Sequence, residues 1–390
     1  MLETSDQFYA VDSLELWYRK YNHQVIDLAG IRGTGKFEII KTFIDRIGFK
    51  DYQVMFLSLN QEHIISLAQK QYHAYYLKHI LYDYYKEYNY DTIKLIDPNS
   101  TELDFKWKKE RNKKINKAYK LIVVLDAELC SIKMIGDIMK FHLPIILVSD
   151  PLVIGTPESY LKIHEPNILI KDITDSNQKN PINHFITKIL NKDTIPYGNF
   201  KSVSVLKKTD SNIFNFKFSD MIIAENQDSV NQLNKIYREK VMKYKTTVNH
   251  TGERLILTED SHQFIENRTE NKIKFFLDQF VTGVITRADQ HSVNRKFISI
   301  DFKPDGYSDI FQGIILDRFF LNKFSNRSIA YPFGPLLKFD YAYAITAFQS
   351  QYGYWNDVTV IEEPYDDWDY HARVLYTGIS RAKKSIILIR

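Results

Sequence analysis

A glycine-rich loop near the start of the chain has the composition of a phosphate-binding site. Its sequence, Gly30-Ile31-Arg32-Gly33-Thr34-Gly35-Lys36, matches the spacing G-x-x-x-x-G-K. In such a loop the backbone N–H groups and the N-terminus of the following helix cradle phosphates, and the lysine reaches the terminal phosphates. An apolar stretch at 24–28 and a helical pattern at 37–47 supply the strand and the helix that the motif requires. We therefore expect phosphate contacts at Gly30, Gly33, Thr34, Gly35 and Lys36.

The residue after the lysine departs from the usual pattern. That position normally carries a serine or threonine whose hydroxyl holds Mg²⁺, but here it is Phe37. Thr34 lies before the second glycine of the loop and cannot simply take over this role. We expect Phe37 to line the phosphate site without supplying a metal ligand.

Acidic residues follow two apolar runs in the middle of the chain. Residues 121–125 and 144–148 predict parallel strands that are covered on both faces. Asp126 and Asp150 come at or just after their ends, where parallel sheets bind ligands. Asp126 is therefore a candidate metal ligand, and Asp150 a candidate for sensing the γ-phosphate or polarising water. Both could instead be helix caps, since acidic residues after strands often are.

A basic residue near the C-terminus could complete such a site. Arg381 ends a predicted helix at 370–381 and is followed by a predicted strand at 385–389. An arginine at a helix end that faces a phosphate site has the geometry of an arginine finger. The alternative is a solvated cation that complements the helix dipole.

Longer stretches predict an α/β chain with two halves. A polar, proline-containing segment at 163–215 predicts a crossover between them. A strand at 221–224 opens the second half, which continues with a helix around 343–351 and a strand at 357–362. Short alternating stretches between 252 and 301 predict a small β-barrel.

A tyrosine-rich region at about 60–118, predicted to be helical, ends in a basic stretch at 108–120. Aromatic and lysine side chains together suit base stacking and phosphate contact. A tyrosine stripe at helical spacing is more often part of a core. Both interpretations stay open from the sequence alone.

Composition limits the class of protein. With 390 residues the chain predicts two or three domains, and 44% hydrophobic with 26% charged residues is typical of a soluble globular protein. No apolar run is long enough to span a membrane, and the polar start of the chain does not resemble a signal peptide. A single cysteine, Cys130, fits a reducing cytoplasm. Because the net charge is only +4, a nucleic-acid site must be a local groove.

The C-terminal residues carry a specific resemblance. Residues 375–384 resemble motif VI of superfamily 1 helicases, Y-T-[AG]-[ILV]-[ST]-R-A-[KR]. Residues 341–351 are similar to motif V, and residues 222–238 to the strand–helix unit that opens the second RecA-like domain. The motifs occur in the family's order over nearly the whole chain, and they are most similar to the RecD/Dda-like branch that is common in phages.

This resemblance implies an α/β fold of two RecA-like P-loop domains with parallel sheets. It implies a first domain at 1–165 with the tyrosine-rich helical insertion, a crossover at 166–215, and a second domain at 216–390. The second domain would hold a small SH3-like β-barrel insertion at about 250–325. The tyrosine-rich region would replace the strand-separating insertion of that branch.

The resemblance also implies roles for single residues. ATP and Mg²⁺ would lie between the domains, with Lys36 and Asp126 acting from the first and Gln351 and Arg381 from the second. Arg381 would be the finger. Single-stranded DNA would cross the top of both domains, with contacts at Thr346, Tyr343 and Ser380.

Several positions depart from the family pattern. The Asp-Glu pair of motif II reads Asp126-Ala127, with Glu128, the candidate for orienting the attacking water, one place late. The phosphate-sensing glutamine of motif III is Val153, and the Arg-Gln pair that follows in this branch would fall near Asp175-Ser176. In motif V the glycine and the glutamate are Tyr352 and Tyr354. Because phosphoryl transfer depends on positioning and electrostatics, these losses should affect turnover more than fold.

Two functions are consistent with this sequence. The first is an ATP-dependent DNA helicase or translocase in replication or recombination, with 5′ to 3′ movement implied by the resemblance to the branch. It would act as a monomer in the cytoplasm, which for a phage protein is the cytoplasm of the host. Its partners would be replisome or recombination proteins. The second is a pseudo-helicase, a DNA-binding or scaffold protein with little hydrolysis. Lys36 and Arg381 favour the first, and Phe37, Ala127 and Val153 the second. We favour the enzyme because Mg²⁺ at phosphate sites is also held by waters and substrate phosphates.

Overall fold

The computed structural model divides into two compact units, which are described one at a time. The first unit comprises Met1–Leu81, Asn112–Ser229 and Ile345–Arg390, and the second comprises Tyr82–Arg111 and Val230–Ala344. The residues described are 2–20, 24–88, 105–111, 115–159, 161, 165–174, 179–209, 219–244, 250–259, 265–266, 274–275, 277–290, 297–307, 310–317 and 337–390. Asp175 and Ser176, where the Arg-Gln pair was expected, lie outside them.

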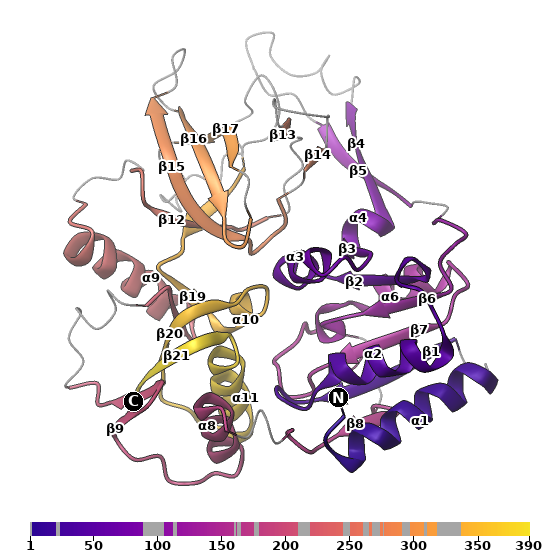
Figure 1. The fold of residues 1–390 in the computed structure, drawn as a ribbon. Helices are drawn as coiled ribbons and strands as arrows, with labels where there is room; N and C mark the ends of the chain where they lie inside the picture. Colours follow the sequence, from indigo (N-terminus) through magenta and orange to yellow (C-terminus); the bar gives the residue numbers. More distant parts are fainter. Residues whose placement is uncertain are drawn as a thin grey trace. The chain divides into compact units, whose positions relative to one another are not determined.

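Six described strands of the first unit form a parallel sheet in the order β3-β2-β6-β7-β1-β8 (Figure 1). The four inner strands are apolar runs that are buried along almost their whole length, as expected for strands covered on both faces. The ends of β6, β7 and β1 therefore lie side by side at one edge of the sheet. The strands are β1 (Val25–Gly30), β2 (Val54–Ser58), β3 (Ala74–Tyr76), β6 (Leu121–Val124), β7 (Ile145–Ser149) and β8 (Ile168–Ile170).

Amphipathic helices cover this sheet. α2 (Lys36–Ile47) buries Ile39, Ile40, Phe43 and Ile44 in one core with α1 (Ser5–Lys20) and the inner strands. None of the described helices is long and apolar enough to cross a membrane. The other helices around this sheet are α3 (Gln61–Gln69), α4 (Leu77–Leu81) and α6 (Ile132–Met139).

A second sheet in the first unit has the described order β19-β11-β20-β21-β10-β9. β11, β20, β21 and β10 run parallel, and β9 pairs antiparallel with β10. The helices α8 (Pro181–Leu190) and α11 (Trp368–Ile379) pack against each other beside this sheet (Figure 1). The strands are β9 (Gly198–Phe200), β10 (Val203–Leu206), β11 (Met221–Ala224), β19 (Ala344–Thr346), β20 (Trp355–Ile361) and β21 (Ala382–Ile389).

The helix predicted around 343–351 is shorter in the structure. β19 occupies its first part, and α10 (Ala347–Ser350) begins only after Thr346. The Thr346 hydroxyl accepts a hydrogen bond from the Gln349 N–H, and the Gln349 side chain accepts one from the Thr346 N–H. This capping box fixes where the helix starts, and it overrides the apolar pattern of the preceding residues.

The segment predicted as the crossover supplies strands to both sheets. β8 lies at 168–170 in the first sheet, whereas β9 and β10 belong to the second. The domain boundaries at 165 and 216 stay predictions.

In the second unit, five described strands form an antiparallel sheet in the order β17-β16-β15-β12-β18. Leu255, Leu257, Ile285 and Phe302 lie in its core. The assignment as an SH3-like barrel stays a prediction. The strands are β12 (Arg254–Leu257), β15 (Thr282–Gln290), β16 (Phe297–Pro304), β17 (Phe311–Asp317) and β18 (Phe339–Tyr341), and a separate pair is formed by β13 (Ile265–Glu266) and β14 (Lys274–Phe275).

The prediction of a helical tyrosine-rich region is wrong for part of that region. Helices α3 and α4 lie in its first part, but β4 (Tyr82–Tyr88) and β5 (Phe105–Arg111) form an antiparallel pair in the second unit. Aromatic residues favour strands, and clustered tyrosines mixed with charged residues lack the apolar stripe that stabilises a helix.

Candidate functional site

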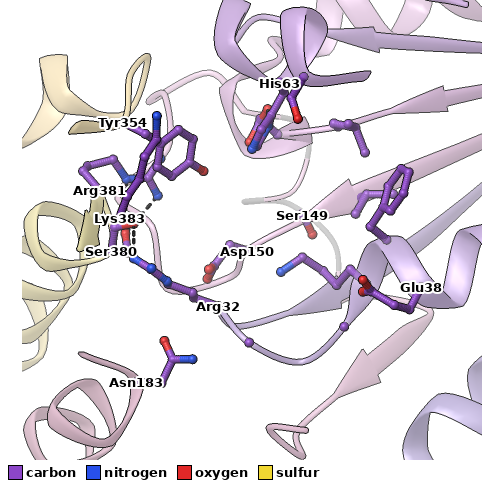
Figure 2. Close-up of a pocket in the computed structure, with 18 of the residues that line it drawn as sticks. Arg32, Glu38, His63, Ser149, Asp150, Asn183, Tyr354, Ser380, Arg381 and Lys383 are labelled. Atoms are coloured by element: carbon purple, nitrogen blue, oxygen red, sulfur yellow. Dashed lines mark hydrogen bonds and ion pairs between the residues drawn. The ribbon is translucent and has the colours of Figure 1, made fainter. Parts of the chain in front are cut away.

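A pocket in the first unit collects polar residues from both of its sheets (Figure 2). Its cavity volume is about 510 Å³, which is within the range of ligand-binding pockets. The glycine loop follows β1, and further residues follow β6 and β7 or lie between α11 and β21. Of the residues predicted from the sequence, Gly33, Gly35, Lys36, Phe37, Asp126, Glu128, Asp150, Ser380 and Arg381 line it.

The glycine loop is held in shape by its own polar groups and by α1. Gly33 and Gly35 have φ values of 90° and 73°, a conformation that residues with side chains rarely adopt. The Thr34 hydroxyl is buried and donates to the Ile31 carbonyl, and Gln7 of α1 donates to the Thr34 carbonyl at 3.0 Å. Thr34 therefore shapes the loop rather than facing the pocket.

Lys36 lies at the N-terminus of α2, directly at the pocket. Its Nζ donates to the carbonyl oxygens of Gly30 at 2.5 Å and Ile31 at 3.2 Å, so its side chain curves over the loop. Backbone N–H groups at a helix N-terminus favour an anion, and the ammonium adds a full positive charge. This end of the pocket suits phosphate groups. Gly30 contributes its carbonyl behind the pocket wall.

Phe37 belongs to an aromatic cluster. Its ring centroid lies 6.2 Å from that of Phe56 and 5.7 Å from that of Tyr72, and the Lys70 ammonium lies 5.7 Å from it. The position that usually carries the metal-binding hydroxyl is thus filled by a packed, apolar ring.

Asp126, the carboxylate predicted to hold the metal, already has two partners. Its Oδ2 accepts hydrogen bonds from the Ser58 hydroxyl at 2.6 Å and from Nδ1 of His63, on α3, at 2.7 Å. Burial acts to raise the pKa of Asp126, but His63, Ser58 and Arg381 together hold it below its usual value. Asp126 is therefore ionised in the pocket.

The fit of these residues to Mg²⁺ can be judged from the donors present. The described residues include no group of three or more His, Cys, Asp or Glu side chains that could hold a metal ion by themselves. Mg²⁺ at phosphate sites keeps several waters and uses one or two carboxylates together with substrate phosphates. Asp126 can supply that carboxylate, whereas Phe37 supplies nothing. The residues fit an ion that is held largely by the phosphates.

Glu128 and Asp150 line the pocket together with Asp126. Burial, followed by the carboxylates of Asp126 and Asp150, raises the pKa of Glu128 to about 8. Glu128 accepts a hydrogen bond from the Asp150 N–H at 3.1 Å, and Asp150 accepts from the Tyr376 hydroxyl and from the Leu152 N–H. Asp150 thus caps the turn that follows β7, which was the alternative to a role at the phosphates. It also lines the pocket.

Arg381 enters the pocket from the end of α11, and it is only 5% exposed. This excludes the solvated helix-end cation. Its Nε and Nη2 donate to the Ser380 hydroxyl at 3.2 and 2.9 Å, and its guanidinium lies 4.6 Å from the centroid of the Tyr354 ring. Burial acts to lower the pKa of Arg381, but Tyr354, Asp126 and Asp150 outweigh it and raise that pKa above its ordinary value. The guanidinium stays charged.

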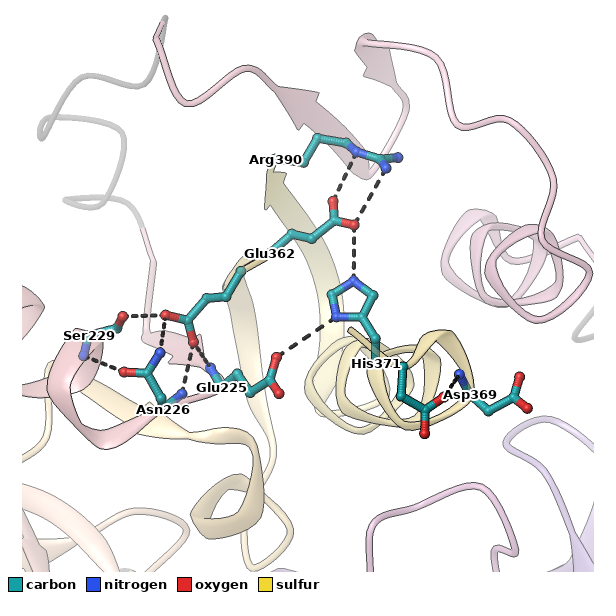
Figure 3. Close-up of polar contacts among 9 residues, drawn as sticks. Glu225, Asn226, Ser229, Glu362, Asp369, His371 and Arg390 are labelled. Carbon is teal, nitrogen blue, oxygen red and sulfur yellow. Dashed lines mark hydrogen bonds and ion pairs between the residues drawn. The ribbon is translucent and has the colours of Figure 1, made fainter. Parts of the chain in front are cut away.

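The other end of α11 is anchored by a buried polar cluster (Figure 3). His371 is 1% exposed, its Nε2 lies 3.1 Å from Oε1 of Glu362, and its ring stacks on Tyr365 at 4.0 Å. Glu362 also pairs with Arg390, and Nδ1 of His371 lies 3.8 Å from a carboxylate oxygen of Glu225. These contacts join α11 to the ends of β20, β21 and β11, so they fix the helix that presents Arg381.

Besides Gly30 and Thr34, three further predicted residues, Gln351, Thr346 and Tyr343, lie away from the pocket wall. Gln351 is buried behind Arg381, where its side-chain oxygen accepts from the Gly155 N–H at 2.7 Å. Thr346 caps α10. Tyr343, in the second unit, is 4% exposed and stacks on Tyr237 at 4.6 Å, which leaves its ring no free face for a base. Ser380, the other proposed DNA contact, is buried in the pocket.

Arg32, His63 and Tyr354 line the pocket although none was predicted as a site residue, and Tyr376 contacts Arg32 and Asp150 beside it. Arg32 and Tyr376 stand inside the motifs that the sequence already marked, and Tyr354 occupies the position of the motif V glutamate, so their places in the motifs were a usable signal. His63 carries no signal of its own, because its contact with Asp126 joins residues 63 positions apart.

Solved structures with this fold exist, although no family model and no curated protein matches the sequence. A Pif1 helicase of Bacteroides bound to single-stranded DNA is similar over 100% of this chain and 92% of its own, with a TM-score of 0.51 and 10% identity. A structure of two coordinating Pif1 helicases on forked double-stranded DNA gives a TM-score of 0.50 at the same identity and coverage. At this identity the similarity shows the fold alone. The chain therefore has the α/β fold of two RecA-like domains that the compared Pif1 helicases have.

Proposed function

We propose that the chain is an ATP-dependent helicase or translocase that acts on single-stranded DNA. The observation that carries this proposal is the convergence of Lys36, Asp126 and Arg381 on one pocket. A lysine for the terminal phosphates, a carboxylate for the metal and a buried guanidinium for developing charge are the parts that phosphoryl transfer to water requires.

In this mechanism Lys36 and the N–H groups of the glycine loop bind the phosphates, and Arg381 stabilises the charge that develops on the transferred group. Mg²⁺, held by Asp126 and the phosphates, would neutralise part of that charge. Glu128 or Asp150 orients the attacking water. Arg381 follows a helix beside the second sheet and Lys36 follows a strand of the first, so nucleotide turnover changes the contact between the two halves. That change is what moves a bound strand.

We further propose that DNA crosses the two RecA-like domains near Thr346 and that movement is 5′ to 3′. The support is the order of the motifs, which is similar to the RecD/Dda-like branch, and the fact that the compared Pif1 structures contain single-stranded or forked DNA. The proposed setting is replication or recombination in the cytoplasm, with the protein acting as a monomer beside replisome or recombination proteins.

A second candidate is a pseudo-helicase that binds DNA with little hydrolysis. Specific observations favour it. Phe37 fills the position of the metal-binding hydroxyl with a packed ring, His63 occupies one oxygen of Asp126, and Val153, in the place of the phosphate-sensing glutamine, is buried at 2% exposure.

An unwinding assay tests the proposed function and its direction. Purified protein is added with ATP and Mg²⁺ to duplexes that carry either a 5′ or a 3′ single-stranded tail, with Lys36→Ala as the matched control. We expect displacement of the strand on the 5′-tailed duplex by wild type alone. Binding to both tails without displacement in ATP would favour the pseudo-helicase, and displacement by the Lys36→Ala protein would reject the pocket as its motor.

A further inference from the structure

Arg32 connects the glycine loop to the backbone that carries Arg381. Its Nη1 donates to the carbonyl oxygens of Ser380 at 2.7 Å and Ala382 at 2.8 Å. These two residues are the chain neighbours of Arg381. Hydrogen bonds with an ionised donor are shorter and stronger than neutral ones. Arg32 therefore ties the glycine loop to the peptide segment that carries Arg381 (Figure 2).

Arg32 is itself fixed at its backbone. Its N–H donates to the Tyr376 hydroxyl at 2.8 Å, and this hydroxyl donates in turn to the carboxylate of Asp150. Tyr376 is fully buried, so the hydroxyl has little freedom to move. The backbone of Arg32 is thus fixed by Tyr376, and its side chain is fixed by the carbonyl oxygens of Ser380 and Ala382.

The guanidinium of Arg32 occupies a buried position that is electrostatically unfavourable for a positive charge. Burial lowers the pKa of Arg32, the positive charge of Arg381 lowers it further, and Tyr354, Tyr376 and Asp150 oppose the shift. Removing a guanidinium from water next to a second guanidinium costs free energy, and an apolar side chain of similar size would fill the space at lower cost. A cation at this unfavourable position indicates that its directed hydrogen bonds to the Ser380 and Ala382 carbonyls have a function.

We propose that Arg32 is a positioning residue for the arginine finger. This inference rests on the proposed function of the pocket. The glycine loop binds the phosphates, and through Arg32 the same loop also holds the peptide that carries Arg381. Arg32 therefore sets the distance between the bound phosphate and the guanidinium of Arg381. The Ser380 hydroxyl and the Tyr354 ring then hold the guanidinium of Arg381 in direction.

The test compares Arg32→Ala, Arg381→Ala and the double variant in single-stranded-DNA-stimulated ATP hydrolysis by the full chain. Loss of a positioning contact should lower kcat of Arg32→Ala by roughly 10²-fold, with little change in ATP affinity. The double variant should be no slower than Arg381→Ala, because Arg32 acts only through the finger, whereas independent roles would multiply. Arg32→Lys should recover much of the rate, since both bonds come from one nitrogen that an ammonium can imitate.

Two controls keep the result interpretable. Arg19→Ala removes an exposed arginine of α1 with 70% side-chain exposure and should behave as wild type. Thermal melting of each variant shows whether it is folded, and Arg32→Gln and Arg32→Lys carry the comparison should the alanine variant unfold. Should wild-type turnover be too slow to follow, the same comparison is made on the affinity for ADP with aluminium fluoride, which imitates the transferring phosphoryl group.

The outcomes separate this inference from the function on which it rests. The positioning role is overturned if the double variant hydrolyses ATP more slowly than Arg381→Ala by the same factor by which Arg32→Ala is slower than wild type. It is also overturned if Arg32→Ala lowers only the affinity for ATP. Arg32→Ala with wild-type turnover, in a protein that loses nucleotide binding with Lys36→Ala, overturns this inference alone. Unchanged nucleotide binding in Lys36→Ala overturns the proposed function itself.

Discussion

At the scale of single residues, the pocket combines a well-formed cationic side with an altered metal side. Lys36 and Arg381 both face the cavity, and the guanidinium stays charged in a buried position. On the metal side, Asp126 is ionised, but one of its oxygens already accepts a hydrogen bond from His63. Phe37 has no oxygen that could bind a metal ion. Ground-state binding of the phosphates should therefore be preserved better than the chemical step.

Tyr354 should matter through its contact with Arg381. Its ring lies 4.6 Å from the guanidinium, and cation–π contacts in desolvated sites are worth about 2 kcal/mol. We expect Tyr354→Ala to lower kcat for ATP hydrolysis by roughly 10- to 30-fold with little effect on ATP binding. Tyr354→Phe keeps the ring face and should retain the wild-type rate. Equal rates for the alanine and phenylalanine variants would show that the stacking does not position the finger.

Phe37 allows a test of the altered metal side. Phe37→Thr returns a hydroxyl to the start of α2 and should raise Mg²⁺-dependent turnover, more so together with Ala127→Glu. The same change removes a ring packed on Phe56 and Tyr72, so thermal unfolding should show a loss of up to roughly 3 kcal/mol. Phe37→Leu, which lacks the hydroxyl, is the matched control. A gain in turnover with leucine as large as with threonine would rule out a metal-binding explanation.

At the scale of elements, the sequence predicted the parts of the site that are local and missed those that depend on distant contacts. The glycine loop, its flanking strand and helix, and the acids after β6 and β7 follow from patterns within short windows. The contact of His63 with Asp126 and that of Arg32 with Ser380 join residues 63 and 348 positions apart, and no window contains both partners. The β4–β5 pair gives no clear strand pattern because its residues lack strict alternation, and α10 starts later than the apolar pattern predicts because a capping box fixes its first residue.

Asp27 on β1 should make the stability of the first sheet depend on pH. It is 5% exposed, and burial raises its pKa from 3.8 to about 7, against a smaller opposing effect of the Ser149 hydroxyl. The folded state therefore binds the proton more tightly than the unfolded state does. The stability that this group contributes is complete below about pH 4 and is lost as the pH rises through about 7, and it amounts to at most roughly 4 kcal/mol.

Asp27→Asn keeps the shape of the side chain and removes the titration. Chemical denaturation at several pH values should show that the variant gains stability over wild type between about pH 5 and 8, and that the two converge near pH 4. A constant difference between the two proteins over this range would show that Asp27 does not carry the proton. Another titrating group would then be responsible for any pH dependence of the fold.

At the scale of the whole molecule, the chain has the fold of a two-domain RecA helicase, and its net charge of only +4 limits how it can bind nucleic acid. Under the proposed function, a strand would be bound by a small number of local phosphate contacts rather than by a general positive surface. Such binding reads no base edges and should have little sequence preference.

Binding of labelled single strands at several salt concentrations measures this property. With about three to five phosphate contacts, affinity should fall roughly 10- to 100-fold between about 50 and 200 mM salt. We expect a matched duplex of the same length to bind more weakly. Affinity that is insensitive to salt, or a preference for the duplex, would contradict a single-strand groove.

The most direct test of the account is the rate of ATP hydrolysis by the purified chain with and without single-stranded DNA, measured for wild type, Lys36→Ala and Arg381→Ala. We predict that DNA stimulates the wild-type rate and that Lys36→Ala loses nucleotide binding. Arg381→Ala should bind ATP nearly as wild type does but hydrolyse it roughly 10³-fold more slowly, as other arginine fingers do. Equal turnover in the Arg381→Ala and wild-type proteins would contradict the claim that the two halves of the first unit form one catalytic site.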